Sequence, residues 1–300
     1  MHSKRRGNLR AIALMLTAVG LFAFMDASLK HLSQGYPPLE LVVLRCLASL
    51  PFLLFYTAWR GNWSTLRPRN VPLHLVRGAL AFTMLASFIY AVSKLSLADT
   101  YAVFLCAPLL MAGLSVPLLG ERVTAGRWCA VALGLAGVLV MLRPTGTGLG
   151  TLGGLAAAVS ALCYALSGIT IRVLSRTDSN GAMVLSFLVL AALGALAGAL
   201  PDWRALAGAD FGWLAFIGVT GAVAQQLITE AFRSAPPAVV GPFEYTAMLW
   251  AFGLDWLLWQ HLPTATVLIG SAIVAVSGLY VIWDERQSNV PAVAPATPQP

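Results

Sequence analysis

Ten long apolar segments occupy nearly all of the 300-residue chain and leave no room for a water-soluble domain. A helix needs about 20 mostly apolar residues to cross a bilayer, and each segment is close to that length. Only 10% of the residues are charged, whereas soluble domains carry about 25%. The segments are residues 11–30, 39–59, 72–93, 97–119, 126–143, 150–171, 181–200, 210–229, 237–259 and 265–283. The sequence therefore predicts an all-α polytopic membrane protein with ten transmembrane helices.

A weak internal repeat relates residues 91–140 to residues 231–280, at an offset of 140 positions. Identical residues at this offset are the pairs Ala91 and Ala231, Ala98 and Ala238, Ala107 and Ala247, Gly113 and Gly253, and Thr124 and Thr264. Each copy closes a group of five predicted helices, and because five is odd, the second group enters the membrane from the opposite side. We therefore predict two inverted five-helix repeats, a construction found in many secondary transporters.

The repeat and the composition divide the chain into four parts. We expect a short N-terminal segment at residues 1–10, a first domain at 11–143 and a second domain at 150–283. Residues 287–300 are rich in proline and alanine, so we expect a disordered tail there.

The basic residues predict the orientation of the helices in the membrane. Of the 19 lysines and arginines, 13 lie on the side of the membrane that holds the two chain ends, and four lie on the other side. The remaining two, Arg45 and Arg77, lie within helices. Positive charge is enriched on the cytoplasmic side of membrane proteins. We therefore expect both termini in the cytoplasm, in the cytoplasmic (inner) membrane of a bacterium. Since the net charge of +7 is spread over the connections, the sequence does not favour nucleic-acid binding.

The sequence holds no arrangement that predicts catalysis. The four cysteines are scattered over predicted helices, and the four histidines form neither an HExxH motif nor a group with metal-ligand spacing. We also find no GxSxG motif. We therefore expect no enzyme activity, no metal and no cofactor.

Three charged residues deep in predicted helices are the first candidates for a binding or coupling site. They are Asp26, Arg45 and Glu244. A charge inside a membrane is costly and calls for a partner or a function. Asp26 has Lys30 one helical turn away, so an intrahelical ion pair is one interpretation. Arg45 and Glu244 come from different halves and could pair with each other, either as a structural contact or as a site for a zwitterionic molecule.

Uncharged residues extend the list of candidates. Gln225 and Gln226 are adjacent in one helix, so at most one of them faces a narrow central cavity, and bonding between helices is the alternative. Tyr101, Tyr164, Tyr245 and Trp250 offer aromatic surfaces. By contrast, Arg77 lies near a predicted cytoplasmic end, where we expect it to reach toward the membrane surface.

Two prolines interrupt corresponding helices of the two halves. Pro108 falls in the fourth predicted helix and Pro242 in the ninth. A proline removes a backbone hydrogen bond, and paired interruptions in both halves favour a binding site between them. Glycine and serine in the fifth and tenth helices instead favour close helix packing. We predict that these two helices form a scaffold and that the other eight surround the cavity.

With these residues the chain resembles the drug/metabolite transporter superfamily, specifically its ten-helix members with two EamA domains. The resemblance covers residues 8–286. The segments that carry it are MDASLKHL at 25–32, YPPLELVVLR at 36–45, LADTYAVFLCAPLLMAGLSVPLLGERV at 97–123 and VGPFEYTAMLWA at 240–251. The last of these is similar to the branch that contains riboflavin-type and S-adenosylmethionine-type carriers, and exporters of opine metallophores such as pseudopaline are similar as well.

The resemblance implies a carrier with a central cavity that opens alternately to each side. Its expected function is export of a small polar or zwitterionic metabolite, with a proton as candidate coupling ion and either a monomer or a homodimer as the working unit. The alternatives are an uptake carrier for a vitamin or nucleoside-like metabolite and a membrane scaffold or sensor that transports nothing. The family's glycine–glutamate pair is present as Gly120 and Glu121, but Gln260 and His261 replace it in the second half.

Overall fold

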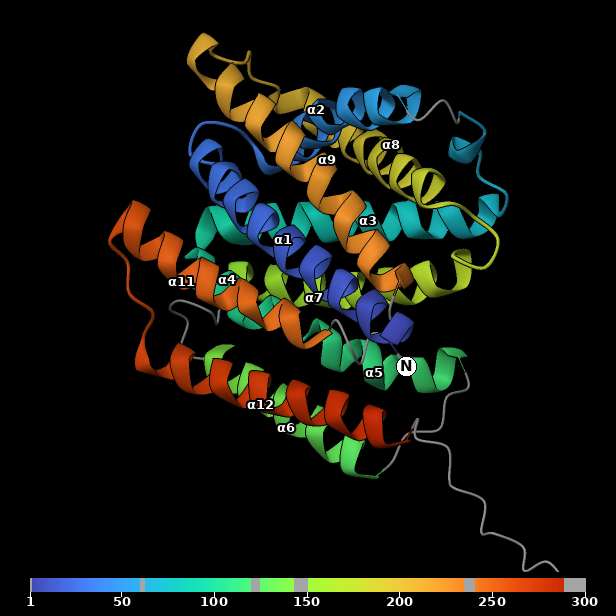
Figure 1. Ribbon diagram of the computed structural model, residues 1–300. Helices are drawn as coiled ribbons and strands as arrows, with labels where there is room; N and C mark the ends of the chain where they lie inside the picture. Colours follow the sequence, from blue (N-terminus) through green and yellow to red (C-terminus); the bar gives the residue numbers. More distant parts are fainter. Residues whose placement is uncertain (1, 60–62, 120–124, 143–150, 235–240, 289–300) are drawn as a thin grey trace, which may run out of the picture.

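The computed structural model describes residues 2–59, 63–119, 125–142, 151–234 and 241–288, and the regular elements in this part of the chain are helices (Figure 1). The first half contains α1 (His2–Leu32), α2 (Pro38–Trp59), α3 (Val71–Lys94), α4 (Leu97–Phe104), α5 (Ala107–Leu119) and α6 (Ala125–Leu142). The second half contains α7 (Leu152–Leu174), α8 (Asn180–Ala199), α9 (Phe211–Ser234), the 3-10 helix η5 (Gly241–Tyr245), α11 (Thr246–Trp259) and α12 (Ala265–Ser288).

The helices follow the predicted apolar segments closely, and the protein is an all-α polytopic membrane protein. Six helical stretches of the described chain are long and apolar enough to cross a membrane: residues 9–32, 38–59, 71–94, 152–174, 180–202 and 208–232. Shorter apolar helices cover 97–111, 128–137 and 265–280. At the two ends of the chain the helices exceed the prediction, because α1 begins at His2 and α12 continues to Ser288. Residues 289–300 of the predicted tail lie outside the described part.

The fourth and ninth predicted helices are not continuous. The segment 97–119 forms two helices, α4 and α5, which are separated at Leu105 and Cys106, and Pro108 is the second residue of α5. In the other half, η5 leads into α11 between Tyr245 and Thr246, and Pro242 is the second residue of η5. Because 105 and 245 differ by 140, both changes of backbone geometry fall at the same position of the repeat.

Helix packing follows the predicted inversion of the two halves. Helix α1 of the first half lies against α9 of the second, and α3 of the first half lies against α7 of the second. Helices α2 and α8, which occupy corresponding positions, pack against each other, as do α6 and α12 (Figure 1). Each repeat therefore completes its core with helices of the other, and neither forms a separate globule.

Small residues bring α6 and α12 into close contact. A methyl group on Gly137 would lie 2.9 Å from the Cγ2 atom of Ile273 and 3.1 Å from the backbone oxygen of Gly270. Real side chains rarely approach so closely, so this contact depends on glycine. The predicted scaffold role of these two helices agrees with this pairing.

The bundle has two ends with different side chains. We call the end that holds Arg67, Arg172 and Arg176 the arginine end, and the one that holds Lys30, Tyr36 and Asp210 the opposite end. At the opposite end, the Tyr36 hydroxyl donates a hydrogen bond to Asp210 Oδ2 at 2.7 Å and accepts one from the backbone N–H of Ala207 at 2.9 Å. These bonds fix the turn after α1 to the start of α9.

At the arginine end a corresponding contact fixes the turn after α7 to the start of α3. The Asp178 carboxylate accepts hydrogen bonds from the backbone N–H of Arg69 at 2.7 Å and from the Thr177 hydroxyl at 2.6 Å, and His74 Nε2 lies 3.1 Å away. Burial raises the pKa of Asp178, but these hydrogen bonds outweigh it and hold the pKa below the usual 3.8.

Candidate functional site

A cavity of about 610 Å³ lies between the two repeats. Its described lining comes from both halves of the chain but includes no residue of α6 or α12, as expected for the predicted scaffold. The cavity extends from Asp26, Arg45 and Tyr101 in the interior to Leu118 and Arg176. Because the last two side chains are exposed, the cavity reaches the surface at the arginine end.

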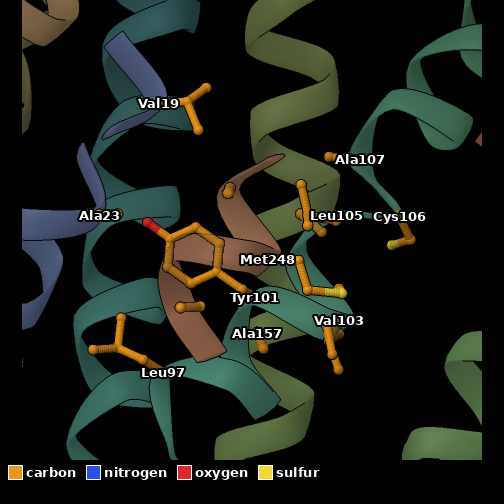
Figure 2. Packing of buried hydrophobic residues seen from close by; sticks show 14 of the residues in the cluster. Val19, Ala23, Leu97, Tyr101, Val103, Leu105, Cys106, Ala107, Ala157 and Met248 are labelled. Atoms are coloured by element: carbon orange, nitrogen blue, oxygen red, sulfur yellow. The ribbon is translucent and has the colours of Figure 1, made fainter. Parts of the chain in front are cut away.

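Asp26 of α1 and Tyr101 of α4 form the first polar pair in the cavity. The Tyr101 hydroxyl donates a hydrogen bond of 2.6 Å to Asp26 Oδ2, and Figure 2 shows the tyrosine ring with its hydroxyl directed toward α1 near Ala23. Phe88 packs edge-on against this ring, with the two ring centres 5.9 Å apart. Asp26 is 5% exposed, and its other oxygen, Oδ1, has no hydrogen-bond partner in the described structure. The hydrogen bond therefore fixes the geometry of the pair, and Asp26 Oδ1 can accept one more hydrogen bond.

Glu244 of η5 and Tyr164 of α7 form a second pair of the same chemistry in the other half. The Tyr164 hydroxyl is the hydrogen-bond partner of the Glu244 carboxyl, and both residues line the cavity. In the repeat, α7 corresponds to α1, and the segment that holds η5 corresponds to the one that holds α4. The two halves therefore use the same pair of helices, but the acid and the tyrosine have exchanged places.

Arg45 of α2 lies beside the first pair and not opposite the second. Its guanidinium interacts electrostatically with Asp26, it lines the cavity, and it is 7% exposed. The suggested ion pair between Arg45 and Glu244 is wrong: among the described residues no carboxylate lies within 4.0 Å of the Arg45 guanidinium. The cavity separates the two charges, and each stays close to groups of its own half.

The remaining sequence candidates divide into lining and non-lining residues. Gln225 lines the cavity and its neighbour Gln226 does not, as their positions on one helix require. Tyr245 lies against Gly278 of α12, and its buried hydroxyl has no hydrogen-bond partner among the described residues. Trp250 is 41% exposed and packs against Phe24 on the outside of α1. Neither Tyr245 nor Trp250 lines the cavity.

Lys30 does not pair with Asp26, and this expectation is also wrong. Its ammonium group lies 2.8 Å from Asp255 Oδ1 of α11 and 4.3 Å from the centre of the Trp259 ring. The other oxygen of Asp255 accepts a 2.6 Å hydrogen bond from the backbone N–H of Ala98, at the start of α4. This contact, which we call the Lys30–Asp255 latch, joins α1, α4 and α11 at the opposite end. Neither Lys30 nor Asp255 lines the cavity, so the cavity does not extend to the opposite end of the bundle at these residues.

Sequence reasoning missed Asp255, although a signal was present. It is a carboxylate inside a predicted spanning segment, which is the criterion that selected Glu244, and it is 0% exposed. Arg77 was placed wrongly for a related reason. Its distance from the helix end favours a side chain that reaches the membrane surface, but it is 1% exposed and lines the cavity. Gly120 and Glu121 lie outside the described residues.

Comparisons with known proteins agree with this architecture. The model of the EamA-like transporter family matches residues 9–143 and 151–283. The chain is 27% identical to the pseudopaline exporter CntI of Pseudomonas aeruginosa, covering 89% of this chain and 93% of the relative. It is 27% identical to a riboflavin transporter of Vibrio cholerae, covering 92% and 94%, and 22% identical to an S-adenosylmethionine uptake transporter of Rickettsia felis, covering 93% and 96%. A solved crystal structure aligns with a TM-score of 0.67 at 21% identity, covering 93% of this chain and 98% of that one, and so shares the fold.

Proposed function

The chain belongs to the EamA-like transporter family, and on this premise we propose that it is a secondary transporter that exports a small polar or zwitterionic metabolite across the cytoplasmic membrane. The observation that carries the proposal is the mixed charge of one cavity: a buried arginine, Arg45, and two carboxyl–tyrosine pairs line the same space. Arg45 offers a site for an anionic group, and the carboxyls of Asp26 and Glu244 offer sites for a cationic group.

We place the arginine end in the cytoplasm, because positive charge is enriched on that side of the membrane. In this orientation the cavity is open to the cytoplasm, and the Lys30–Asp255 latch closes the outer side. Transport then requires the opposite arrangement, in which the latch opens and the arginine end closes. The inverted repeats supply two arrangements of similar energy, because each half can adopt the conformation of the other.

Proton exchange follows from the same carboxyls. A cationic group on the substrate and a proton both neutralise a buried carboxylate, so each weakens the binding of the other. Release of the substrate outside is then favoured by proton uptake on Asp26 or Glu244. The tyrosine hydroxyls keep each carboxyl oriented toward the cavity in both protonation states, since a phenol oxygen both donates and accepts. No step in this cycle calls for catalysis, a metal or a cofactor, and a monomer or a homodimer would serve equally.

The test is efflux from proteoliposomes that contain purified protein and are loaded with a bacterial metabolite extract. Mass spectrometry then identifies each metabolite that leaves, with and without a proton gradient. We expect Glu244→Gln to abolish transport or to make it independent of the gradient, because the amide cannot titrate. Glu230→Gln is the matched control, since Glu230 is a half-buried acid of α9 that lies outside the cavity lining.

The outcome also separates the alternatives. Unchanged flux with unchanged pH dependence in Glu244→Gln would remove this residue from the mechanism. The aromatic rings that line the cavity, among them Phe22, Phe88 and Phe104, favour as second candidate an uptake carrier for a flat vitamin or nucleoside-like molecule. Inward flux of such a molecule would support it. Absence of flux for every metabolite in the extract would favour a scaffold or sensor.

A further inference from the structure

Arg77 is a buried cation that forms no ion pair with any carboxylate of the described residues. It lies on α3, lines the cavity and is 1% exposed. Its Nη1 atom donates a 2.5 Å hydrogen bond to the backbone oxygen of Met183, and its guanidinium lies 5.5 Å from the centre of the Phe187 ring. Its Nε atom has no hydrogen-bond partner in the described structure, where no carboxylate lies within 4.0 Å of the side chain.

Membrane topology does not account for this burial. Arginines that set orientation keep their charge in water or among lipid headgroups, as the exposed Arg67 and Arg69 at the same end do. Arg77 instead points into the space between the repeats, where an unpaired charge costs at least a few kcal/mol. A ligand anion in the cavity would offset that cost.

Arg45 and Arg77 lie at different depths of the same cavity. Arg45 is seven residues from Pro38, at the opposite end of α2, and Arg77 is six residues from Val71, at the arginine end of α3. At a rise of about 1.5 Å per residue, each arginine lies roughly 10 Å inside its own end. Since α2 is 22 residues long, the two backbones are separated by roughly 10–15 Å along the cavity. The guanidinium groups keep this separation, because that of Arg77 is bonded to Met183, three residues inside the arginine end of α8, and that of Arg45 lies near Asp26, six residues inside the opposite end of α1. One compact anionic group therefore does not reach both.

We infer that Arg77 is a second anion-binding residue of the cavity, and that the transported molecule carries at least two separated anionic groups, one held by Arg45 and one by Arg77. This inference rests on the proposed transport function and narrows its substrate to a molecule with excess carboxylate or a similar oxyanion. The described lining supports it, because it holds the cations Arg45, Arg77 and Arg176 besides the acids Asp26 and Glu244. Arg176 lies at the cavity mouth, where its charge attracts anions from solution.

The test measures binding of simple probes to purified protein in detergent. The probes are straight-chain α,ω-dicarboxylates from butanedioate to dodecanedioate, each compared with the monocarboxylate of equal chain length. Binding is followed as the rise in unfolding temperature, read from the fluorescence of the nine tryptophans. We expect a dicarboxylate of intermediate or greater length to bind about tenfold tighter than its monocarboxylate, because it makes a second charge-assisted contact.

Variants assign that preference to the two arginines. Arg77→Gln is expected to bind the dicarboxylate no better than the monocarboxylate, and Arg45→Gln should behave alike, whereas Arg77→Lys should retain part of the preference. Arg67→Gln is the control, because it removes an equal charge from the same end outside the cavity. A preference that survives in Arg77→Gln, or that falls equally in Arg67→Gln, would overturn the inference, as would its absence from the unmodified protein. If the protein prefers dicarboxylates but shows no flux in proteoliposomes, the proposed transport function is overturned and the second anion site is not. If it shows flux but no preference for dicarboxylates, only the inference about Arg77 is overturned.

Discussion

The Lys30–Asp255 latch is expected to decide which side of the cavity is closed. Asp255 accepts hydrogen bonds from the Lys30 ammonium at 2.8 Å and from the Ala98 backbone N–H at 2.6 Å. One carboxylate therefore joins three helices. The informative perturbation is Asp255→Asn, because the amide oxygen still accepts the Ala98 hydrogen bond while the negative charge is lost. Asp255→Ala removes both interactions and serves to separate their effects.

The magnitude follows from the burial of the two side chains. Asp255 is 0% exposed and Lys30 is 13% exposed. Removing one partner of a fully buried pair costs about 3–5 kcal/mol. Because Lys30 keeps some contact with water, we expect about 2–3 kcal/mol for Asp255→Asn, which shifts a two-state equilibrium roughly 30- to 150-fold. A closed state that is favoured about 99 to 1 would then be open in roughly a quarter to 60% of the molecules. Lys30→Gln should act more strongly, since it leaves the fully buried carboxylate unpaired.

The assay is a distance distribution between two spin labels at the opposite end of the bundle. Cysteines replace Gln34, after α1, and Leu262, after α11, both of which are exposed. The native cysteines Cys46, Cys106, Cys129 and Cys163 are replaced beforehand. We expect one distance in the parent protein and an additional, longer distance in Asp255→Asn and Lys30→Gln. The parent distribution in both variants would refute the reasoning. Lys94→Gln is the control, because Lys94 is an exposed lysine at the same end without an ion pair in the described structure.

Three further predictions concern stability, measured as the unfolding temperature of purified protein. Gln260 ends α11 with φ of 53°, a conformation that favours glycine, so Gln260→Gly should stabilise the protein by about 1 kcal/mol. A methyl group on Gly218 would collide with the backbone oxygen of Ala48, so Gly218→Ala should cost about 1–3 kcal/mol, whereas Gly212→Ala, at an open position, should cost little. The pKa of Asp178 is lowered in the folded protein, so its contribution is present above pH 3.8 and is lost as the pH falls through the lowered value. Asp178→Asn should therefore be less stable than the parent at pH 7, and the difference should shrink below pH 3.8. A constant difference would contradict the pKa assignment.

Hydrophobicity alone predicts most of this fold, because a spanning helix must be apolar over a fixed length whatever its neighbours are. Depth likewise identifies Asp26, Arg45 and Glu244, since a charge in a membrane protein faces the interior. The partners of these charges are not predictable in this way. Spacing along one helix favours Lys30 as the partner of Asp26, but the partner that binds Lys30 is 225 residues away on α11. The carboxylate that pairs with Lys30 depends on how α1 and α11 cross, and no local sequence pattern encodes that crossing.

The exchanged carboxyl–tyrosine pairs explain why the repeat alignment conceals the site. At the offset of 140, Asp26 aligns with Leu166 and Tyr101 with Gly241, so neither pair is visible in the sequence. In space the two acids lie at different depths, as the inversion of the halves requires. Asp26 lies six residues from the end of α1, about 9 Å from the opposite end, whereas the 14 residues of α11 place Glu244 about 20 Å from it. An opening on either side therefore reaches one acid before the other. Under the proposed exchange of conformations, Glu244 is the first acid to meet the cytoplasm and Asp26 the first to meet the outside, which gives a proton and a substrate different acids to occupy at each end of the cycle.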